Sequence, residues 1–363
     1  MNKKVLMSGD PMIPSELFEG AYEKHLKQYF NDKALGNWED DWGQLQDRRL
    51  KVEQNGPEIE TVPEICKTHS DAEVLTGLFV PVSSKLMDTM PNLRMVGLAR
   101  AGKENINLDE ATKRGILAFN VMGRNAEAVS DFTVGLMLSE SRNIAKAHHS
   151  IKQGAWQKEF ANIDFIPQLK GKKVGIAGFG YIGRLVAQKL SGWDLEVLVY
   201  DAFTNDEDIK ASGCTPVDKE TLFKESDFIS INLRLVEATK HWVDEAHLNM
   251  MKKTAYIVNT GRSGLIDTNA LLDVLKNKKI AGAGLDVFDQ EPLEQGNPWV
   301  ELDNVTLTTH IAGTTTEVLT NSPYLLMEDM ERFLSGEKAR FILNPEVLEN
   351  ASFKEWLKEV KNV

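Results

Sequence analysis

The segment Lys173–Ala187 restricts the possible folds of this chain more than any other. An apolar run, Val174-Gly175-Ile176-Ala177, leads into Gly178-Phe179-Gly180-Tyr181-Ile182-Gly183, and the helix-forming run Arg184-Leu185-Val186-Ala187 follows at once. A strand, three glycines in the pattern G-x-G-x-x-G and a helix, in this order, form the phosphate-binding turn of dinucleotide-binding folds. The segment therefore predicts a parallel α/β domain that binds a dinucleotide.

Each glycine of this turn has its own expected role. Gly178 allows the tight turn, Gly180 lets the backbone approach a pyrophosphate, and Gly183 lets helix and strand pack closely. The first N–H groups of the following helix lack partners within the helix and are available to phosphate oxygens. These residues are therefore expected to bind the cofactor.

An acidic residue follows the next predicted strand. The run Leu195–Tyr200 ends at Asp201, eighteen residues after Gly183. A carboxylate at this place accepts hydrogen bonds from the ribose hydroxyls of the adenosine and repels a 2′-phosphate. Residues 202–207 contain no Arg or Lys to bind such a phosphate. We therefore expect NAD rather than NADP, although Asp201 could also simply cap the end of the strand.

Strand-length apolar runs alternate with helix-period segments along most of the 363 residues, which indicates an α/β protein with parallel sheets. A first series covers residues 3–120 and a second begins near residue 173, where the spacing of the runs predicts a doubly wound sheet. The strands expected in the second series are Lys173–Ala177, Glu196–Tyr200, Thr215–Val217, Phe228–Asn232, Ala255–Asn259, Ala281–Val287 and Val305–Thr308.

Two helices and one polar stretch define the domains. A long helix over Asn125–Gln153 bridges them, and a last helix over Glu317–Leu334 returns to the first domain. The expected substrate domain is therefore discontinuous, with residues 1–121 and 314–345. Residues 122–313 form the expected NAD-binding domain, and 346–363 are interpreted as a polar tail. The polar stretch 31–55, which contains tryptophan, interrupts the first series.

Composition excludes several classes of protein. The 42 Lys and Arg residues against 54 Asp and Glu residues give a formal charge of −12, which disfavours nucleic acid and anionic membranes as partners. Cys66 and Cys214 are far apart, without the spacing of metal ligands, so no metal is expected and a reducing cytoplasm is the natural compartment. No apolar run approaches the length of a membrane span or a leader peptide.

Three polar residues follow strands near the nucleotide site. Arg262 comes after the strand that ends at Asn259, Glu291 follows Leu285–Asp289, and His310 comes directly after Val305–Thr308. Open α/β sheets bind ligands at the carboxyl ends of their strands. Histidine suits proton transfer near neutral pH, a carboxylate can fix its tautomer, and the planar fork of arginine grips a carboxylate. Together they predict transfer of a hydride to or from C2 of a 2-hydroxy or 2-oxo acid.

Taken singly, each residue has a plainer interpretation. A histidine at a strand end is more often structural, an arginine in a loop is usually a surface charge, and a glutamate before proline is often part of a turn. The hypothesis depends on all three residues facing one crevice. His148 and His149 lie in the long predicted helix and gain nothing from this argument.

At this point the chain resembles a known family, the D-isomer-specific 2-hydroxyacid dehydrogenases, over roughly residues 74–345. Its motifs are Arg100-Ala101-Gly102 before Glu104-Asn105-Ile106, Gly123–Val129, the glycine turn, Asn259–Gly264, Leu285–Pro292 and Thr309-His310-Ile311-Ala312-Gly313.

The resemblance implies a role for each of these residues. Arg262 would bind the substrate carboxylate and carbonyl, His310 would be the general acid and base, Glu291 its partner, and the backbone at Ala101 and Gly102 would hold the carboxylate. Asp286 would meet the nicotinamide carboxamide. The further cofactor contacts that it implies are Tyr181, Ile182, Leu233, Thr260, Gly261 and Gly313.

The resemblance also implies the architecture and the substrate class. Two Rossmann-like domains, a flavodoxin-like substrate domain and a doubly wound NAD-binding domain, would be hinged over a cleft, in a homodimer paired through the NAD-binding domain. The segment Arg100–Asn105 favours a phosphorylated or polyhydroxylated acid as substrate.

Some residues depart from the family pattern, and two other functions compete. Asn232 and Arg234 stand where the family often has His and Pro, so Arg234 is either a contact to cofactor or phosphorylated substrate or a solvated loop charge. Formate dehydrogenase has Gln in place of the carboxylate partner, and Glu291 argues against it. An NAD-sensing corepressor would bind NADH without turnover, and the trio Arg262, Glu291 and His310 favours an enzyme over it.

Overall fold

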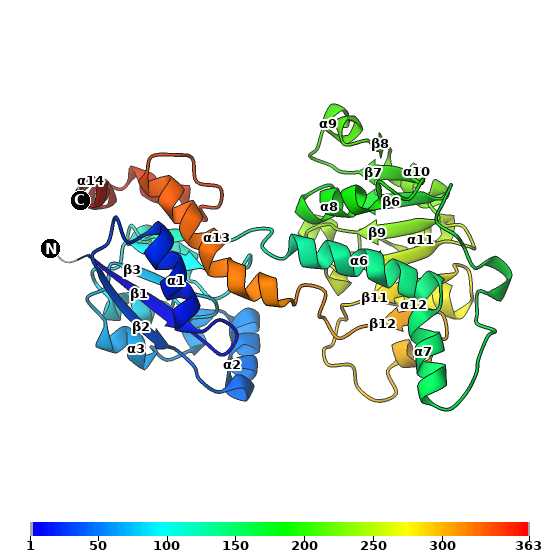
Figure 1. Cartoon of the computed structure of the whole chain (residues 1–363), viewed down its shortest axis with the longest axis horizontal. Helices are drawn as coiled ribbons and strands as arrows, with labels where there is room; N and C mark the ends of the chain where they lie inside the picture. The colour runs from blue at the N-terminus through cyan, green and yellow to red at the C-terminus, as the bar shows by residue number, and fades with distance from the viewer. Residues whose placement is uncertain (1–2, 362–363) are drawn as a thin grey trace. The chain divides into compact units, whose positions relative to one another are not determined.

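The computed structural model of the chain describes residues 3–361 (Figure 1). They form two compact units, one made of the residues up to Arg124 and from Thr315 onward, the other of Asn125–Thr314. The first unit is thus built from two separate stretches of chain.

A parallel sheet forms the centre of the first unit. Its strand order is β2-β1-β3-β4-β5, with every neighbouring pair parallel. This is the flavodoxin-like order, so the predicted fold of this unit is confirmed. The strands are β1 (Lys4–Gly9), β2 (Asp32–Asn37), β3 (Val74–Gly77), β4 (Met95–Leu98) and β5 (Leu117–Phe119).

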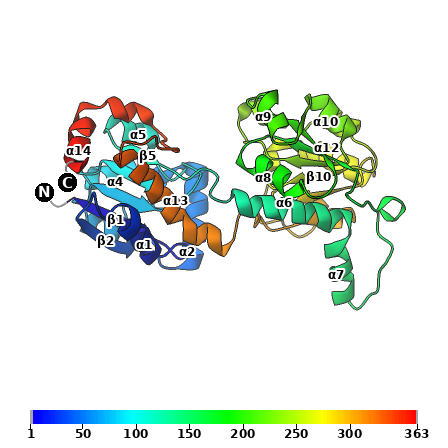
Figure 2. The ribbon, with the colours of Figure 1, turned by 45° about the horizontal axis from the view of Figure 1, so that its top comes forward.

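Helices cover this sheet, and α13 lies beside α1 in both views (Figure 1, Figure 2). The helical elements of the unit are α1 (Ser15–His25), α2 (Trp42–Asn55), η1 (Pro57–Ile59), α3 (Glu64–Thr68), α4 (Ser84–Thr89), α5 (Leu108–Lys113), α13 (Thr316–Leu334), η6 (Pro345–Glu349) and α14 (Ala351–Lys361).

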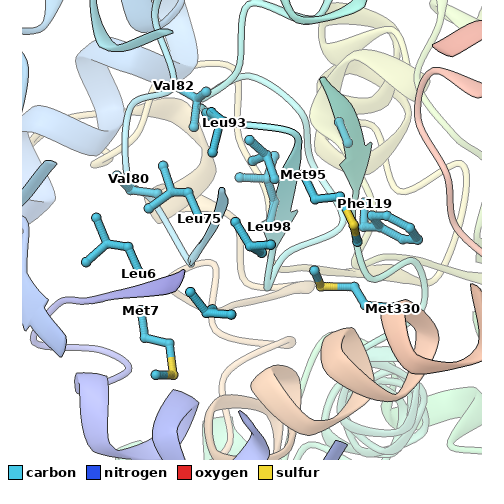
Figure 3. Close-up of a cluster of buried hydrophobic side chains, with 14 of the residues drawn as sticks. Leu6, Met7, Leu75, Val80, Val82, Leu93, Met95, Leu98, Phe119 and Met330 are labelled. Atoms are coloured by element: carbon cyan, nitrogen blue, oxygen red, sulfur yellow. The ribbon is translucent and has the colours of Figure 1, made fainter. Parts of the chain in front are cut away.

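The core of the first unit joins the strands to the returning helix (Figure 3). Met330 of α13 is fully buried together with Met95 of β4 and Phe119 of β5. A side chain at Gly97 would overlap Leu326 of α13 at 2.9 Å. The close approach of α13 to β4 therefore requires glycine in this strand.

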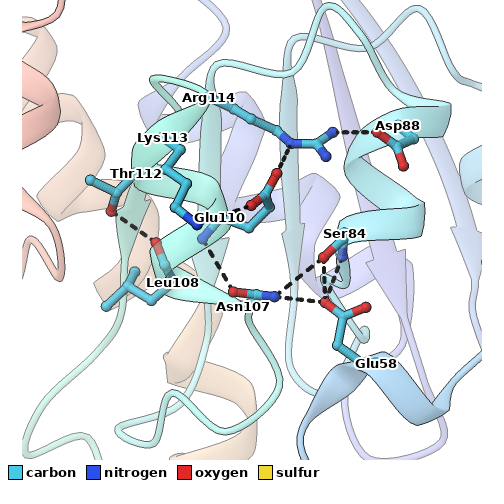
Figure 4. Close-up of polar contacts among 9 residues, drawn as sticks. All are labelled: Glu58, Ser84, Asp88, Asn107, Leu108, Glu110, Thr112, Lys113 and Arg114. Carbon is cyan, nitrogen blue, oxygen red and sulfur yellow. Dashed lines mark hydrogen bonds and ion pairs between the residues drawn. The ribbon is translucent and has the colours of Figure 1, made fainter.

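A polar network ties η1 to the helices α4 and α5 (Figure 4). The carboxylate of Glu58 accepts hydrogen bonds from the backbone N–H and hydroxyl of Ser84, at 2.8 and 2.6 Å, and from Asn107 Nδ2 at 2.7 Å. Burial acts to raise the pKa of Glu58, but these donors outweigh it and hold the pKa below its usual value. The network fixes the segment that follows α2.

The interpretation of residues 346–363 as a polar tail was wrong for the part of it that the structure describes. Most of that part is α14, where Phe353 and Val360 are buried in the core of the first unit. Trp356 Nε1 also donates to Glu73 Oε2 at 2.7 Å. Apolar residues at positions 353, 356, 357 and 360 follow a helical period, which the polar composition of the segment hid.

The second unit contains the doubly wound sheet, in the order β12-β11-β10-β9-β6-β7-β8, again fully parallel. Counted from β6, this is the Rossmann order with one further strand. The strands are β6 (Lys173–Ala177), β7 (Glu196–Tyr200), β8 (Thr215–Pro216), β9 (Phe228–Ile231), β10 (Tyr256–Asn259), β11 (Gly282–Leu285) and β12 (Val305–Leu307).

The predicted bridging helix Asn125–Gln153 is two helices in the structure. Helix α6 (Ala126–Ser141) ends before Asn143, which has a left-handed backbone with φ of 59°, and α7 (Ile144–Lys152) follows. Asparagine tolerates this conformation better than most residues, so a run of good helix formers can still break here. Asn143 Nδ2 donates to Asn162 Oδ1 at 2.8 Å, which ties the break to the loop beyond α7.

The other helical elements of the second unit are α8 (Tyr181–Leu190), α9 (Asp206–Ala211), α10 (Lys219–Glu225), α11 (Glu245–Met250), α12 (Thr268–Lys276) and the short turns η2 (Ile163–Phe165), η3 (Glu237–Thr239), η4 (Ser263–Leu265) and η5 (Pro298–Glu301). Within residues 3–361, none of the helices is both long and apolar enough to cross a membrane.

Candidate active site

The glycine turn between β6 and α8 has the geometry that its sequence predicts. Gly178 has a positive φ of 94°, and a Cβ there would lie 2.8 Å from the carbonyl oxygen of Asn232. A Cβ on Gly183 would lie 2.0 Å from the carbonyl oxygen of Gly178. Both positions therefore require glycine, one for backbone conformation and space, the other for space alone.

Gly180, by contrast, lies beside open space. A Cβ there would have no heavy atom within 4 Å among the described residues, and no side chain caps the first turn of α8. Tyr181 is exposed, and Ile182 packs partly against the core of the unit. Open space at the uncapped N-terminus of α8 fits the pyrophosphate of a dinucleotide.

Asp201 lies at the carboxyl end of β7 and is tied to the same turn. Its carboxylate accepts hydrogen bonds from the backbone N–H groups of Phe179 at 2.6 Å and of Phe203 and Thr204 at 2.8 Å. Partial burial acts to raise the pKa of Asp201, but these donors outweigh it and lower the pKa from its usual value. The residue is held ionised beside the glycine turn, as a ribose acceptor requires.

His310 and Glu291 form a hydrogen-bonded pair. Nδ1 of His310 lies 2.7 Å from Oε2 of Glu291, and the other carboxylate oxygen accepts the N–H of Phe288 at 2.9 Å. The side chain of His310 is 46% exposed, so the ring can still reach a ligand. Its φ of 56° is uncommon for a residue other than glycine, and such backbones cluster at functional sites.

Asp286 anchors the loop that carries His310. The side chain is fully buried, and its oxygens accept hydrogen bonds from Thr308 Oγ1 at 2.6 Å, Ile311 N–H at 3.0 Å and Ala312 N–H at 2.9 Å. These three residues lie on both sides of His310. In the sequence, Asp286 is only an aspartate directly after a buried strand, which does not predict this anchor.

Asn259 anchors the loop that carries Arg262 in a similar way, which its position in the sequence does not predict either. Its Nδ2 donates to the carbonyl of Arg262 at 2.9 Å, and its Oδ1 accepts the N–H of Gly261 at 3.0 Å. The guanidinium of Arg262 is exposed and donates to the carbonyl of Gly261 at 2.8 Å. Thr260 Oγ1 lies 2.8 Å from Thr133 Oγ1 of α6, in a buried contact.

The second unit gathers most of the predicted site residues at one edge of its sheet. Arg262 follows β10, Asp286 and Glu291 follow β11, and His310 follows β12, and these three strands are neighbours. Leu233 follows β9 and packs over Gly178. The tight space at Gly313 faces Asn125, whose Nδ2 would be 2.6 Å from a Cβ there. Arg234 is exposed in the loop after β9.

Ala101 and Gly102 lie in the first unit, in the loop after β4. Asn120 Nδ2 donates to the carbonyl of Ala101 at 2.7 Å, and Val121 N–H donates to that of Arg100 at 2.9 Å. A Cβ on Gly102 would lie 2.1 Å from Oε2 of Glu104. The residues just after β5 thus hold this loop in place, and the charged side chains of Arg100 and Glu104 lie next to Gly102.

The chain is similar in sequence to known proteins over most of its length. Residues 134–312 match the family model described as D-isomer specific 2-hydroxyacid dehydrogenase, NAD binding domain. The chain is 38% identical to the glyoxylate reductase of Thermofilum pendens, over 78% of this chain and 85% of that protein. It is 33% identical to the D-3-phosphoglycerate dehydrogenase of Archaeoglobus fulgidus, over 75% of this chain and 51% of that protein.

Solved structures have the same fold. A crystal structure of a protein from Pyrococcus horikoshii OT3 has a TM-score of 0.69 at 27% identity, covering 98% of this chain and 99% of that one. The NAD complex of a D-isomer specific 2-hydroxyacid dehydrogenase from Lactobacillus delbrueckii ssp. bulgaricus has a TM-score of 0.73 at 22% identity, covering 94% and 100%.

The fold, the glycine turn and these similarities define the class: the chain belongs to the D-isomer-specific 2-hydroxyacid dehydrogenase family. It is an NAD-dependent oxidoreductase that interconverts a 2-hydroxy acid and its 2-oxo acid, and the corepressor alternative is set aside.

Proposed function

We propose that His310, Glu291 and Arg262 carry out the chemistry on a D-2-hydroxy acid or its 2-oxo acid. The observation that carries this proposal is the 2.7 Å pair between His310 Nδ1 and Glu291 Oε2. It leaves Nε2 as the ring nitrogen that can exchange a proton with a ligand, while Glu291 fixes the orientation of the ring. A carboxylate partner alone does not mark a catalytic histidine, since His247 has one too. His310 combines this partner with an exposed ring in the loop that follows β12.

During reduction, His310 gives its Nε2 proton to the C2 oxygen of the substrate, and during oxidation it takes that proton back. NAD supplies the hydride donor and acceptor when it is bound. Arg262 holds the substrate carboxylate and steadies the negative charge that grows on the C2 oxygen. Asp286 and Asn259 act through the backbone and keep the loops of His310 and Arg262 in place.

We propose that the backbone of Ala101 and Gly102 also binds the substrate carboxylate. The hydrogen bonds from Asn120 and Val121 support this by fixing the carbonyls of the loop. The cofactor contacts proposed for this chain are those of the glycine turn with Asp201, and Leu233, Thr260, Gly261, Asp286 and Gly313.

The test is oxidation of NADH, followed by its near-ultraviolet absorbance, with a panel of 2-oxo acids. His310→Ala should lower kcat by about 10²–10⁴, the usual contribution of a general acid, while the Kd for NADH stays within about twofold. His247→Gln is the matched control, since His247 also pairs with a carboxylate, Asp244, at 2.6 Å. Equal loss of NADH binding in both variants would refute the assignment.

The substrate is proposed to be a small 2-oxo acid, with a phosphorylated or polyhydroxylated acid as first choice. Relatives named glyoxylate reductase and D-3-phosphoglycerate dehydrogenase support this range. The panel therefore includes glyoxylate, hydroxypyruvate, pyruvate and 3-phosphohydroxypyruvate.

We propose further that the protein is a homodimer, paired through the second unit. Ile144, Ile151 and Trp156 expose 57%, 55% and 77% of their surface along α7 and the loop after it. Large exposed apolar side chains grouped in this way are typical of protein interfaces. Sedimentation velocity tests this, and Trp156→Ser together with Ile151→Ser should shift a dimer toward monomer.

We also propose that the protein is located in the cytoplasm. Cys66 and Cys214 are both buried free thiols, as expected for a reducing compartment. Cell fractionation with an antibody against the protein tests this location.

A further inference from the structure

Three arginines of the first unit lie in or near the loop after β4. Arg100 belongs to this loop, Arg49 lies on α2, and Arg124 follows β5. The guanidinium groups of Arg49 and Arg100 lie over the ring of Phe79, 5.4 and 4.7 Å from its centroid. Two chain segments therefore bring positive charge to one aromatic ring.

These arginines are not fully paired by the residues that the structure describes. Nε of Arg49 and Nη1 of Arg100 are buried and have no hydrogen-bond partner within residues 3–361. Arg124 donates to Ser322 Oγ at 3.0 Å, and no carboxylate is found within salt-bridge distance of it or of Arg49 in that range. Unsatisfied donors of this kind are costly unless a ligand completes them.

The preceding arginine of α2 shows what a structural role looks like in this fold. Arg48 bonds Glu39 at 2.7 Å and Glu60 at 2.6 Å, and it stacks on Trp38 at 4.5 Å from the ring centroid. Its charge is compensated within the chain. Arg49, one residue further, has the aromatic contact without any acid.

The only compensating acids described near the cluster bind Arg100. Nη2 of Arg100 contacts Glu53 at 2.8 Å and Glu104 at 3.1 Å. Three guanidinium groups against two carboxylates leave one positive charge, and both carboxylates contact Arg100 rather than Arg49 or Arg124. Burial, and then the positive charge of Arg100, lower the pKa of Arg124 to about 10, as expected where like charges are held close.

The cluster lies beside the proposed carboxylate loop. A Cβ on Gly102 would lie 2.9 Å from Nη2 of Arg100. A substrate whose carboxylate is held by the backbone at Ala101 and Gly102 would therefore extend its other end past the guanidinium of Arg100. An anionic group at that end would meet the unpaired donors.

We propose that Arg49, Arg100 and Arg124 form a subsite for a second anionic group of the substrate, a phosphate ester or a carboxylate borne on the carbon chain beyond C2. This inference rests on the proposed function, because it assumes that the first unit binds the acid. It assigns a specificity role to α2, in the stretch 31–55.

The test compares kcat/KM for pairs of substrates that differ only in the second anion. The pairs are 3-phosphohydroxypyruvate with hydroxypyruvate, and 2-oxoglutarate with 2-oxopentanoate. We expect at least one dianionic acid to be preferred by tenfold or more, and the pair that responds identifies phosphate or carboxylate. Arg49→Gln and Arg124→Gln should each remove about tenfold to a hundredfold of that preference, the range for one hydrogen bond to a charged group.

Controls separate this subsite from a general effect on folding. Both variants should turn over the monoanionic acids within about threefold of the wild-type rate, and Arg49→Lys should restore part of the preference. Lys51→Gln removes a charge from the exposed side of the same helix, where Lys51 pairs with Asp47, and should leave the preference unchanged. Equal losses for both members of a pair, or no preference in the wild type, would overturn the subsite.

A binding measurement keeps the two proposals distinguishable. Calorimetric titration with 2-phosphoglycolate, in the presence of NADH, requires no turnover. Weaker binding to Arg49→Gln alongside absent turnover would support the subsite and reject the proposed reaction. If Arg49→Gln binds 2-phosphoglycolate as tightly as the wild type and turnover is normal, the proposed reaction is supported and the subsite is rejected.

Discussion

Replacing single glycines by alanine separates the structural from the cofactor-binding role of the turn after β6. In Gly183→Ala the new Cβ would lie 2.0 Å from the carbonyl oxygen of Gly178 and 3.1 Å from Cγ2 of Ile176. Carbon atoms pack comfortably at about 3.5–4.0 Å, so the backbone of α8 or of the turn must move by more than about 1 Å. In Gly180→Ala the Cβ meets no described atom within 4 Å.

The size of the effect follows from these contacts. Overpacking a tight site costs about 1–3 kcal/mol, and the contact with backbone places Gly183→Ala at the upper end. For a domain of this size, about 3 kcal/mol lowers Tm by roughly 6–12 °C. Gly180→Ala should keep the Tm within about 2 °C, since a surface change without contacts alters stability by about 0.5 kcal/mol at most. It should nevertheless weaken NADH binding by about tenfold or more, because its methyl group occupies the side open to the pyrophosphate.

The assays are thermal unfolding without cofactor, which avoids stabilisation by bound ligand, and fluorescence titration with NADH. Gly135→Ala in α6 is the control, because a Cβ there also has no described neighbour within 4 Å. It should raise stability by about 0.5–1 kcal/mol, the usual gain over glycine inside a helix. A Gly183→Ala protein with normal Tm and normal NADH affinity would show that the reasoning from this contact is wrong.

Three further changes test the loops of the site. Asp286→Asn should lower both Tm and kcat, because an amide offers one acceptor atom to three donors and the loss of a buried partner costs about 1–3 kcal/mol. Measuring kcat of each protein at the same interval below its own Tm separates the effect on catalysis from the effect on stability. Glu291→Gln should lower kcat by about tenfold or more while the Kd for NADH stays constant, and an unchanged kcat would reject the His310 pair. The lowered pKa of Asp201 means that its ionised form stabilises the fold fully above the ordinary carboxylate pKa of about 4 and less as pH falls through the lowered value. The stability difference between wild type and Asp201→Asn should therefore be constant from about pH 6 to 8 and shrink toward about pH 3, as unfolding in urea at each pH will report.

Much of the second unit could be predicted because its strands are buried on both faces. Such strands are short, continuous apolar runs, and in a doubly wound sheet they recur at a regular spacing. The run Val174–Ala177 with its glycines shows this directly. Strand β5 escaped prediction, and so did β2, which like β5 lies at an edge of the other sheet. The sequence of β2, Asp32–Asn37, has only Ala34 and Leu35 as apolar residues, because an edge strand needs less burial.

The site divides in the same way between what a local pattern can reveal and what only contacts between distant residues reveal. Arg262, Glu291 and His310 could be found because each stands at a strand end, where the fold class itself suggests ligands. Asp286 stands at such an end too, yet its hydrogen bonds around His310 depend on where the chain goes after β12. The position alone could suggest a ligand contact but not an anchor.

Arg48 and Arg49 show the limit most sharply. The two are adjacent in the sequence and chemically identical, and no local pattern distinguishes them. Their difference comes from Glu39 and Glu60, which reach Arg48, and from Phe79 and the loop after β4, which Arg49 faces. Because these partners come from other elements, a specificity role for one arginine and a structural role for the other can be assigned only once α2 is placed on the sheet. The two arginines should therefore respond differently to the same substitution. Arg49→Gln should change substrate preference, whereas Arg48→Gln should leave Glu39 and Glu60 without this partner and chiefly lower the Tm.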